Sequence, residues 1–130
     1  NMDNNDAIHV ELTDGIIRCF YKVYNKLRYG FLERVYQNAL RYELEKSGYA
    51  VEVQKKIEVY YEDHLVGEYY ADLVVNDFVI IELKAAESLC DEHAVQLLNY
   101  LRATDIEVGL LLNFGKKPQV SRKQFRNVTK

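Results

Sequence analysis

Two apolar runs in the middle of the chain carry charged residues where burial is costly. Asp72 lies within Tyr-Tyr-Ala-Asp-Leu-Val-Val, and ten residues later Glu82 belongs to the run Phe-Val-Ile-Ile-Glu-Leu-Lys, which ends at Lys84. Aliphatic and β-branched residues dominate both runs, which predicts two β-strands. Carboxylates and an ammonium group are costly to bury among such residues unless they pair or hold a metal ion. The sequence therefore predicts neighbouring strand ends where two acids and a lysine meet around a hard cation.

Strand alternation sets a condition on this cluster. Glu82 and Lys84 are two residues apart, so they share a face of the sheet. A two-residue turn at Asn76-Asp77 would pair Asp72 with Ile81 and put the two acids on opposite faces. A three-residue loop, or a bulge near Asp72, would place Asp72 opposite Glu82. We expect one of these two devices; the alternative is that Asp72 is an edge residue that faces water.

The remaining elements follow from apolar periodicity and turn residues. Asp91 is a candidate N-cap for the third helix, and Thr13 or Asp14 for the stronger half of the first. A helix between the last two strands indicates a crossover, so we expect an α/β fold with a mixed central β-sheet flanked by helices, in the order α-α-β-β-β-α-β. One more strand is compatible with residues 119–126. The pattern predicts helices over 7–27, 31–47 and 91–104, and strands over 51–61, 66–75, 78–84 and 108–114.

Composition indicates one globular domain over residues 1–130. Residues 1–6 begin Asn-Met and are expected to be disordered or derived from cloning. No apolar run is long enough for a membrane helix and no signal peptide is visible, so we expect a cytoplasmic protein. Two cysteines, Cys19 and Cys90, are too few for a disulfide framework and favour reduced thiols.

The charge is unevenly distributed along the chain. Residues 113–130 hold six basic residues and no acid, which gives that segment +6; because the net charge is −3, residues 1–112 carry −9. A basic tail over 116–130 can engage phosphates through counterion release. The alternative, slightly favoured, is a solvated terminal segment that balances an acidic body.

The two acids and the lysine suit metal-assisted cleavage of a phosphodiester. Mg²⁺ prefers hard oxygen ligands, so the carboxylates of Asp72 and Glu82 with the backbone carbonyl of Leu83 are sufficient. Such an ion neutralises charge on the scissile phosphate and lowers the pKa of a bound water. Lys84 can then orient or deprotonate that water, or stabilise the developing charge. The alternative is a simple Lys84–Glu82 ion pair on the sheet surface.

Three further polar positions carry little information when each is taken alone. Glu33 lies in the first turn of the second helix, where the helix dipole favours an acid in any case. Gln96 and Tyr100 are four residues apart on one face of the third helix, with His93 three residues before Gln96. Taken alone, each position is better explained by a helix N-terminus or a surface helix face, and for His93 a capping or packing role is favoured over a catalytic one.

Together, these residues resemble the PD-(D/E)xK nuclease superfamily, and within it the small bacterial family of GxxExxY proteins. The resemblance covers residues 10–118, and its ordered set of positions is far more specific than the Glu-x-Lys triplet alone. Ala71 stands where the superfamily has a proline, and Leu-Arg-Tyr-Gly over 27–30 replaces the usual Leu-Gly-Pro-Gly turn. The matching positions are Gly30, Glu33 and Tyr36 for the name motif, Asp72, Glu82 and Lys84 for the metal and lysine site, and Gln96 and Tyr100 for the Gln-x-x-x-Tyr helix signature.

The resemblance implies a restriction-endonuclease-like core and roles for these residues. Asp72 and Glu82 would bind Mg²⁺ or Mn²⁺, with Glu33 as a further acidic ligand, directly or through water. Lys84 would handle the attacking water, while Gln96 and Tyr100 would position the lysine, metal waters or phosphate.

Three functions compete at this stage. The first is a metal-dependent nuclease acting on DNA. The second is a non-catalytic interaction module with a nuclease-like fold in a repair or defence complex, and the third, weaker, is a hydrolase of nucleotide phosphate esters. The intact acid and lysine set favours the first. Because residues 1–112 carry −9, positive surface for nucleic acid would have to come from the tail, a protein partner or a second subunit of a homodimer.

Overall fold

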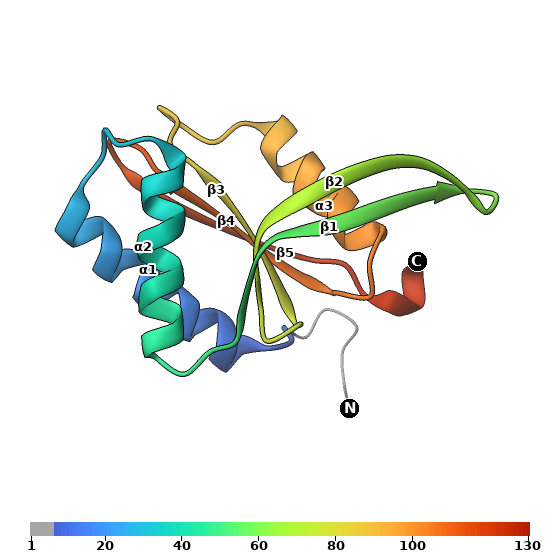
Figure 1. Ribbon diagram of the computed structural model, residues 1–130, viewed down its shortest axis with the longest axis horizontal. Helices are drawn as coiled ribbons and strands as arrows, with labels where there is room; N and C mark the ends of the chain where they lie inside the picture. The colour runs from blue at the N-terminus through green and yellow to red at the C-terminus, as the bar shows by residue number, and fades with distance from the viewer. Residues whose placement is uncertain (1–6) are drawn as a thin grey trace.

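The computed structural model describes residues 7–130, which form a sheet with helices on both faces (Figure 1). Residues 1–6, for which disorder or a cloning origin was expected, lie outside this described part. None of the helices within residues 7–130 has the length and apolarity needed to span a bilayer. The elements are α1 (Val10–Leu27), α2 (Glu33–Lys46), β1 (Val51–Tyr61), β2 (His64–Val75), β3 (Val79–Lys84), α3 (Asp91–Arg102), β4 (Val108–Phe114), β5 (Pro118–Gln124) and a short 3-10 helix (Asn127–Thr129).

The sheet within residues 7–130 is mixed, as the sequence predicts. Its five strands lie in the order β1-β2-β3-β4-β5. β3 and β4 are parallel, and the other neighbouring strands are antiparallel. α3 connects the two parallel strands, which is the crossover that parallel pairing requires. The expected α-α-β-β-β-α-β order is confirmed, with β5 as one further strand at the edge.

Apolar side chains form a core on each face of the sheet in the described part of the chain. α1 and α2 pack on one face, against alternate residues of β3 and β4 such as Ile81 and Leu110. α3 packs on the other face, where Ile80 and Leu111 are buried. β4 is buried along its whole length, because its successive residues point to opposite faces of the sheet and helices cover both faces. The sheet is therefore the middle layer of three.

The turn between β2 and β3 settles the register on which the two acids depend. Val75 pairs with Val79, which leaves a three-residue loop over 76–78. Leu73 then pairs with Ile81, so Asp72 stands opposite Glu82. The expectation of a three-residue loop or a bulge is confirmed, and the first of the two devices is present.

The β1–β2 hairpin forms a long arm whose side chains exchange faces partway along. Val53 packs with the α1–α2 core, whereas Ile57, four residues further on, packs against α3. Leu73 and Ala71 differ in the same way although they are only two residues apart. The pairing of β1 with β2 skips Gln54, which has a φ of 52°. Beyond this irregularity the arm leaves the main sheet and lies alongside α3 (Figure 1).

Two helix starts differ from the sequence-based expectation. α1 begins at Val10, so Thr13 lies inside the helix, where its hydroxyl donates to the Val10 carbonyl (3.1 Å). The prediction that Thr13 or Asp14 caps the helix is therefore wrong, because the helix extends a turn further back than the strongest apolar spacing. α3 begins at Asp91 with Cys90 before it, so Asp91 is the first helical residue rather than the N-cap.

The basic C-terminal segment over 116–130 is largely built into the fold. Residues Pro118–Gln124 form β5 on the edge of the sheet, which agrees with the strand compatible with 119–126. Asn127–Thr129 form the short 3-10 helix that follows. Two of the six cations of this segment, Arg122 and Lys123, thus lie on a paired strand.

Candidate active site

The candidate site lies where β2 separates from β3. Asp72 and Glu82 face each other just beyond the paired residues Leu73 and Ile81. The backbone N–H of Asp72 donates to Glu82 Oε2 (2.9 Å), and the N–H of Leu83 donates to Asp72 Oδ2 (2.7 Å). In a continuing strand pair these N–H groups would donate to backbone carbonyls of the neighbouring strand. Here they donate to side-chain carboxylates instead. This exchange fixes both carboxylates at the point where the sheet opens.

Burial raises the pKa of both carboxyls, and the charge of Asp72 raises that of Glu82 further. Glu82 is 5% exposed. Its burial, reinforced by the nearby charge of Asp72, raises the pKa of the Glu82 carboxyl from 4.5 to about 8. Burial also raises the pKa of Asp72, although hydrogen bonds from the Leu83 N–H and Gln54 and the charge of Lys84 oppose that shift. Two adjacent carboxylates, one buried and one half-buried, are suited to a site that receives positive charge.

Lys84 ends β3 on the same face as Glu82, as alternation predicts. Its positive charge lowers the pKa of both carboxyls, which places it beside the pair. Among the described residues, Lys84 forms no ion pair within 4.0 Å, so the alternative of a direct Lys84–Glu82 ion pair is not what the structure has.

The loop after Lys84 is fixed by a buried amide. Asn113, which pairs with Lys84 across β3 and β4, accepts the Ala86 N–H (2.9 Å) and donates to the Ala86 carbonyl (3.0 Å). Gly115 approaches the same loop so closely that an added Cβ would lie 2.0 Å from the Ala86 oxygen. These contacts set the direction in which the chain leaves the site after Lys84.

Glu33 comes to the site from the layer formed by α1 and α2. It is the first residue of α2 and is exposed. It lines a small cavity of about 170 Å³ together with Asp72 and Leu83. Its charge contributes to the raised pKa of Glu82, as the charge of Asp72 does.

Gly30 and Tyr36 build the turn that holds Glu33 in place. Gly30 has a φ of +114°, a conformation that side-chain-bearing residues rarely adopt. The buried Tyr36 hydroxyl donates to the Arg28 carbonyl (2.6 Å) and accepts the Phe31 N–H (3.1 Å). The Tyr36 ring stacks on Phe114 of β4 at 4.3 Å between centroids. Gly30 and Tyr36 therefore have structural roles, and Glu33 is the acid that they position.

α3 contributes Gln96 and Tyr100 from the face opposite α2. Both line one cleft, so their four-residue spacing places them on a common face as expected. Tyr100 is 6% exposed, and its burial, followed by the charges of Glu82 and Asp72, raises its pKa to about 12. Tyr100 thus stands beside the carboxylate pair. His93 accepts the Cys90 N–H at Nδ1 (3.3 Å), which confirms the capping role.

The donor set brings two carboxylates together rather than three. Within residues 7–130, no group of three or more His, Cys, Asp or Glu side chains is close enough to hold a metal ion. Asp72 and Glu82 form the close pair, with Leu83 on the same cavity wall, and Glu33 stands further away. Paired hard oxygens that repel each other in a buried position nevertheless fit a divalent cation that keeps several waters.

Sequence reasoning missed the polar side chains that surround Asp72. Gln54 Nε2 donates to Asp72 Oδ1 (3.4 Å) and to Gln37 Oε1 (2.9 Å), and Arg34 lines the same cavity. Gln54 occupies a polar position in an alternating strand and carries no distinguishing pattern. The positions of Arg34 and Gln37, one and four residues after Glu33, follow only when α2 is known to face the opened sheet.

Comparison with known proteins identifies the superfamily of the chain. The family model of the PD-(D/E)XK nuclease superfamily matches residues 10–125, a span that contains every position of the candidate site. No curated protein and no solved structure matches the chain. The resemblance inferred from the sequence is confirmed at the level of the superfamily.

The raised pKa of Glu82 leads to a pH-dependent stability in divalent-free buffer. The folded protein favours the neutral carboxyl, so its stabilising contribution is complete below pH 4.5 and is lost as the pH rises through about 8. We expect the free energy of unfolding to fall by several kcal/mol across that window, measured by urea unfolding at a series of pH values. Glu82→Gln, which mimics the neutral carboxyl, should flatten most of the slope.

The matched control is Glu45→Gln, which alters an exposed acid on α2 and should leave the slope unchanged. A wild-type stability that is constant or rises over this pH window, or a Glu82→Gln variant with the wild-type slope, would contradict the assigned environment of Glu82.

Proposed function

The chain belongs to the PD-(D/E)XK nuclease superfamily, and we propose that it is a metal-dependent nuclease that hydrolyses phosphodiester bonds of DNA. The observation that carries this proposal is the reciprocal hydrogen bonding of Asp72 and Glu82, which holds two carboxylates together at the opening of the sheet. A binding module without chemistry would gain nothing from charges held in this costly position.

The residues present fit a divalent cation, Mg²⁺ or Mn²⁺. Asp72 and Glu82 would hold it with the backbone carbonyl of Leu83, and Glu33 would act through water because it stands outside the close pair. When bound, such an ion supplies charge neutralisation at the phosphate and a more acidic water. The Asp72 and Leu83 N–H groups keep the carboxylates oriented, so little reorganisation is needed when substrate arrives.

Lys84 supplies the remaining chemistry. Its amine lies on the same strand face as Glu82 and is not committed to an ion pair within residues 7–130. It can therefore orient or deprotonate the attacking water, or stabilise charge that develops on the phosphate. Tyr100 and Gln96, on α3, would position the lysine, metal waters or the phosphate from the opposite side.

We place the chain within the GxxExxY group of the superfamily. The arrangement of Gly30, Glu33 and Tyr36 supports this placement, because the glycine and the tyrosine build the turn that presents the glutamate to the site. The substituted turn residues over 27–30 leave that function of the motif in place.

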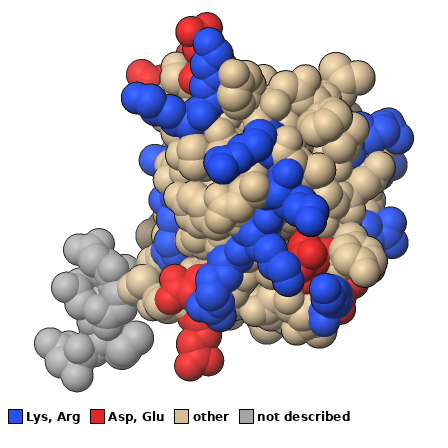
Figure 2. Space-filling model, turned by 90° about the vertical axis from the view of Figure 1, so that its left-hand side faces the viewer, with Lys and Arg blue, Asp and Glu red and all other residues tan. Residues whose placement is uncertain are grey.

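A nucleic-acid substrate requires positive surface, and the cations that gather on the side of α1 and α2 support the proposal. Figure 2 shows Lys and Arg side chains in a band across the face where α1 and α2 lie, with acids at its margins. On α1, Arg18, Lys22 and Lys26 recur every four residues and are all exposed, so they share one side of the helix. The excess of acids in the chain is thus not spread evenly over its surface.

Lys116 is a second cation, besides Arg34, that lines a pocket together with Glu33 of the candidate site. It lines a pocket of about 640 Å³ together with Gly30, Glu33 and Ala86. The Tyr24 hydroxyl donates to the carbonyl oxygens of Gly115 (2.8 Å) and Lys116 (2.7 Å), which fixes the backbone that carries this lysine. We therefore assign Lys116 a contact to a substrate phosphate close to the scissile bond.

The nuclease activity is tested by replacing Lys84. Wild-type protein with Mg²⁺ or Mn²⁺ should cut labelled DNA, and EDTA should stop the reaction. Lys84→Ala should lower the cleavage rate by roughly 10²- to 10⁴-fold, the range typical for loss of a general acid–base group. Circular dichroism and thermal unfolding of the variant check that the fold persists.

Undiminished cutting by Lys84→Ala would exclude this site as the source of the activity. If wild type cuts no DNA with either ion, the chain is instead a non-catalytic module that retains the nuclease fold.

The phosphate contact of Lys116 predicts a change in binding rather than in folding. Lys116→Ala should weaken DNA binding several-fold and reduce the salt dependence of the binding constant by about one counterion, measured by fluorescence anisotropy at several salt concentrations. Lys46→Ala is the matched control, because it removes the same charge at the far end of α2, roughly 20 Å from Glu33. Equal losses in the two variants would show that the effect is one of net charge alone.

A further inference from the structure

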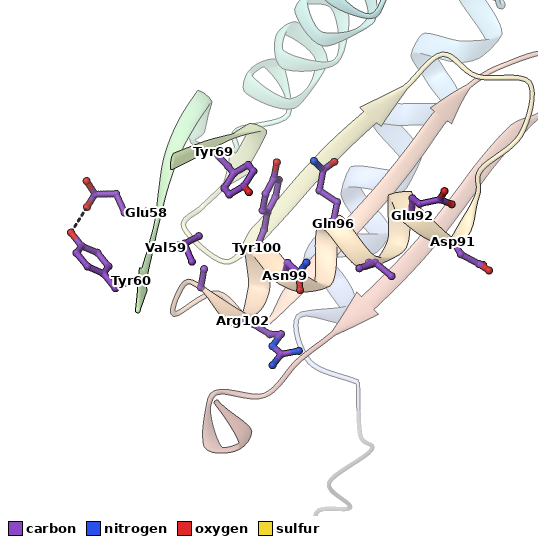
Figure 3. A pocket seen from close by; sticks show the side chains of 12 residues that line it. Glu58, Val59, Tyr60, Tyr69, Asp91, Glu92, Gln96, Asn99, Tyr100 and Arg102 are labelled. Atoms are coloured by element: carbon purple, nitrogen blue, oxygen red, sulfur yellow. Dashed lines mark hydrogen bonds between the residues drawn. The ribbon is translucent and has the colours of Figure 1, made fainter. Parts of the chain in front are cut away.

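A large cleft adjoins the carboxylate pair on the α3 side of the sheet. It has a volume of about 1040 Å³ and lies between the β1–β2 arm and α3 (Figure 3). Tyr100 and Gln96 line it, so it begins at residues that already belong to the candidate site. Asp72 and Glu82 do not line the cleft, so Tyr100, which stands beside them, connects it to the candidate site.

An aromatic pair lies in this cleft. Tyr69 of the arm and Tyr100 of α3 have ring centroids 5.7 Å apart and an interplanar angle of 47°. Figure 3 shows the two rings side by side, with Gln96 one turn before Tyr100 on α3. Tyr69 is 47% exposed, whereas Tyr100 is 6% exposed. The Tyr69 ring thus rests on a buried partner and offers aromatic surface to a ligand.

The charges that line the cleft disfavour a phosphate backbone. Three acids, Glu58, Asp91 and Glu92, stand against one base, Arg102. The Arg102 guanidinium is also directed at the Phe125 ring, 5.7 Å from its centroid. A duplex, which presents phosphates on its outside, would meet like charge here. A nucleobase, which is uncharged and planar, would not.

Two amides in the cleft can bind the edges of a base. Gln96 and Asn99 both line it, on neighbouring turns of α3. Within residues 7–130 neither side chain makes a hydrogen bond to another residue, so their donors and acceptors remain available. Aromatic surface with uncommitted amides and an acidic rim is suited to unpaired bases.

We propose that this cleft binds the bases of single-stranded DNA, stacked on Tyr69, and that the site accordingly acts on single-stranded segments rather than on intact duplex. The claim that the site acts on single-stranded segments rests on the proposed nuclease function. The claim that the cleft binds bases does not. With bases in the cleft, we expect the next phosphate of the strand to lie near Asp72 and Glu82. The phosphates after it would then lie toward Lys116. Stacking accepts every base, so we expect no strong sequence preference.

The test compares binding of a fluorescein-labelled 15-nucleotide oligothymidylate with that of a blunt duplex of the same length. Anisotropy is measured with wild type, Tyr69→Ala, Tyr69→Phe and Tyr61→Ala in EDTA, where no cleavage can occur. Tyr61 is the matched control because it is 67% exposed on the same arm but does not line the cleft. Circular dichroism of each variant confirms that it is folded.

We expect wild type to bind the single strand at least tenfold more tightly than the duplex. Tyr69→Ala should weaken single-strand binding by about 5- to 150-fold, the range of one lost base–aromatic stack. Tyr69→Phe, which keeps the ring, and Tyr61→Ala should bind like wild type. Equal affinity for duplex, or wild-type binding by Tyr69→Ala, would overturn the proposal.

Cleavage of the same two substrates with Mn²⁺ separates this inference from the proposed function. A wild type that cuts duplex as fast as single strand overturns the single-strand assignment and leaves the nuclease intact. A wild type that binds single strands through Tyr69 but cuts neither substrate supports the cleft assignment and contradicts the nuclease.

Discussion

The fold and the site depend on one exchange of hydrogen bonds. Where β2 and β3 part, the Asp72 N–H turns to the Glu82 carboxylate and the Leu83 N–H turns to the Asp72 carboxylate. The strands can separate there without leaving these backbone donors unsatisfied, which would cost about 1–3 kcal/mol for each buried group. The same bonds hold two carboxylates in a buried position that favours their neutral forms. The two hydrogen bonds that end the β2–β3 pairing therefore also hold the carboxylates on which the proposed chemistry depends.

Around this pair, both helical layers supply residues to one point of the sheet. The Gly30–Tyr36 turn presents Glu33 from α2, and α3 presents Tyr100 from the other face. β4 supports both sides, because Phe114 stacks with Tyr36 and Asn113 fixes the loop after Lys84. The opening of the sheet is what allows groups from opposite faces to approach the same carboxylates. A continuous β2–β3 pairing would keep them apart.

The sequence predicts the element types, and it limits the register to a few choices, because only a three-residue loop or a bulge would place Asp72 opposite Glu82; the structure has the loop. The sequence does not predict the course of the arm. Val53, Ile57 and Val59 all stand at alternate positions with Lys55 as the one polar interruption, and a single lysine does not by itself indicate the positive φ of Gln54 or the exchange of faces that follows. Glu33 also lies further from the pair than a three-acid ligand set requires. Its position depends on where α2 begins, which tertiary contacts of Tyr36 decide.

The central claim is that Asp72 and Glu82 together form the cation site, and Mn²⁺ titration followed by backbone amide NMR tests it most directly. At substoichiometric Mn²⁺, the signals of Asp72, Leu83 and Lys84 should broaden first, and Asp72→Asn should abolish this selectivity. Initial broadening at the exposed acids Asp91 and Glu92, or an unchanged pattern in Asp72→Asn, would contradict the account.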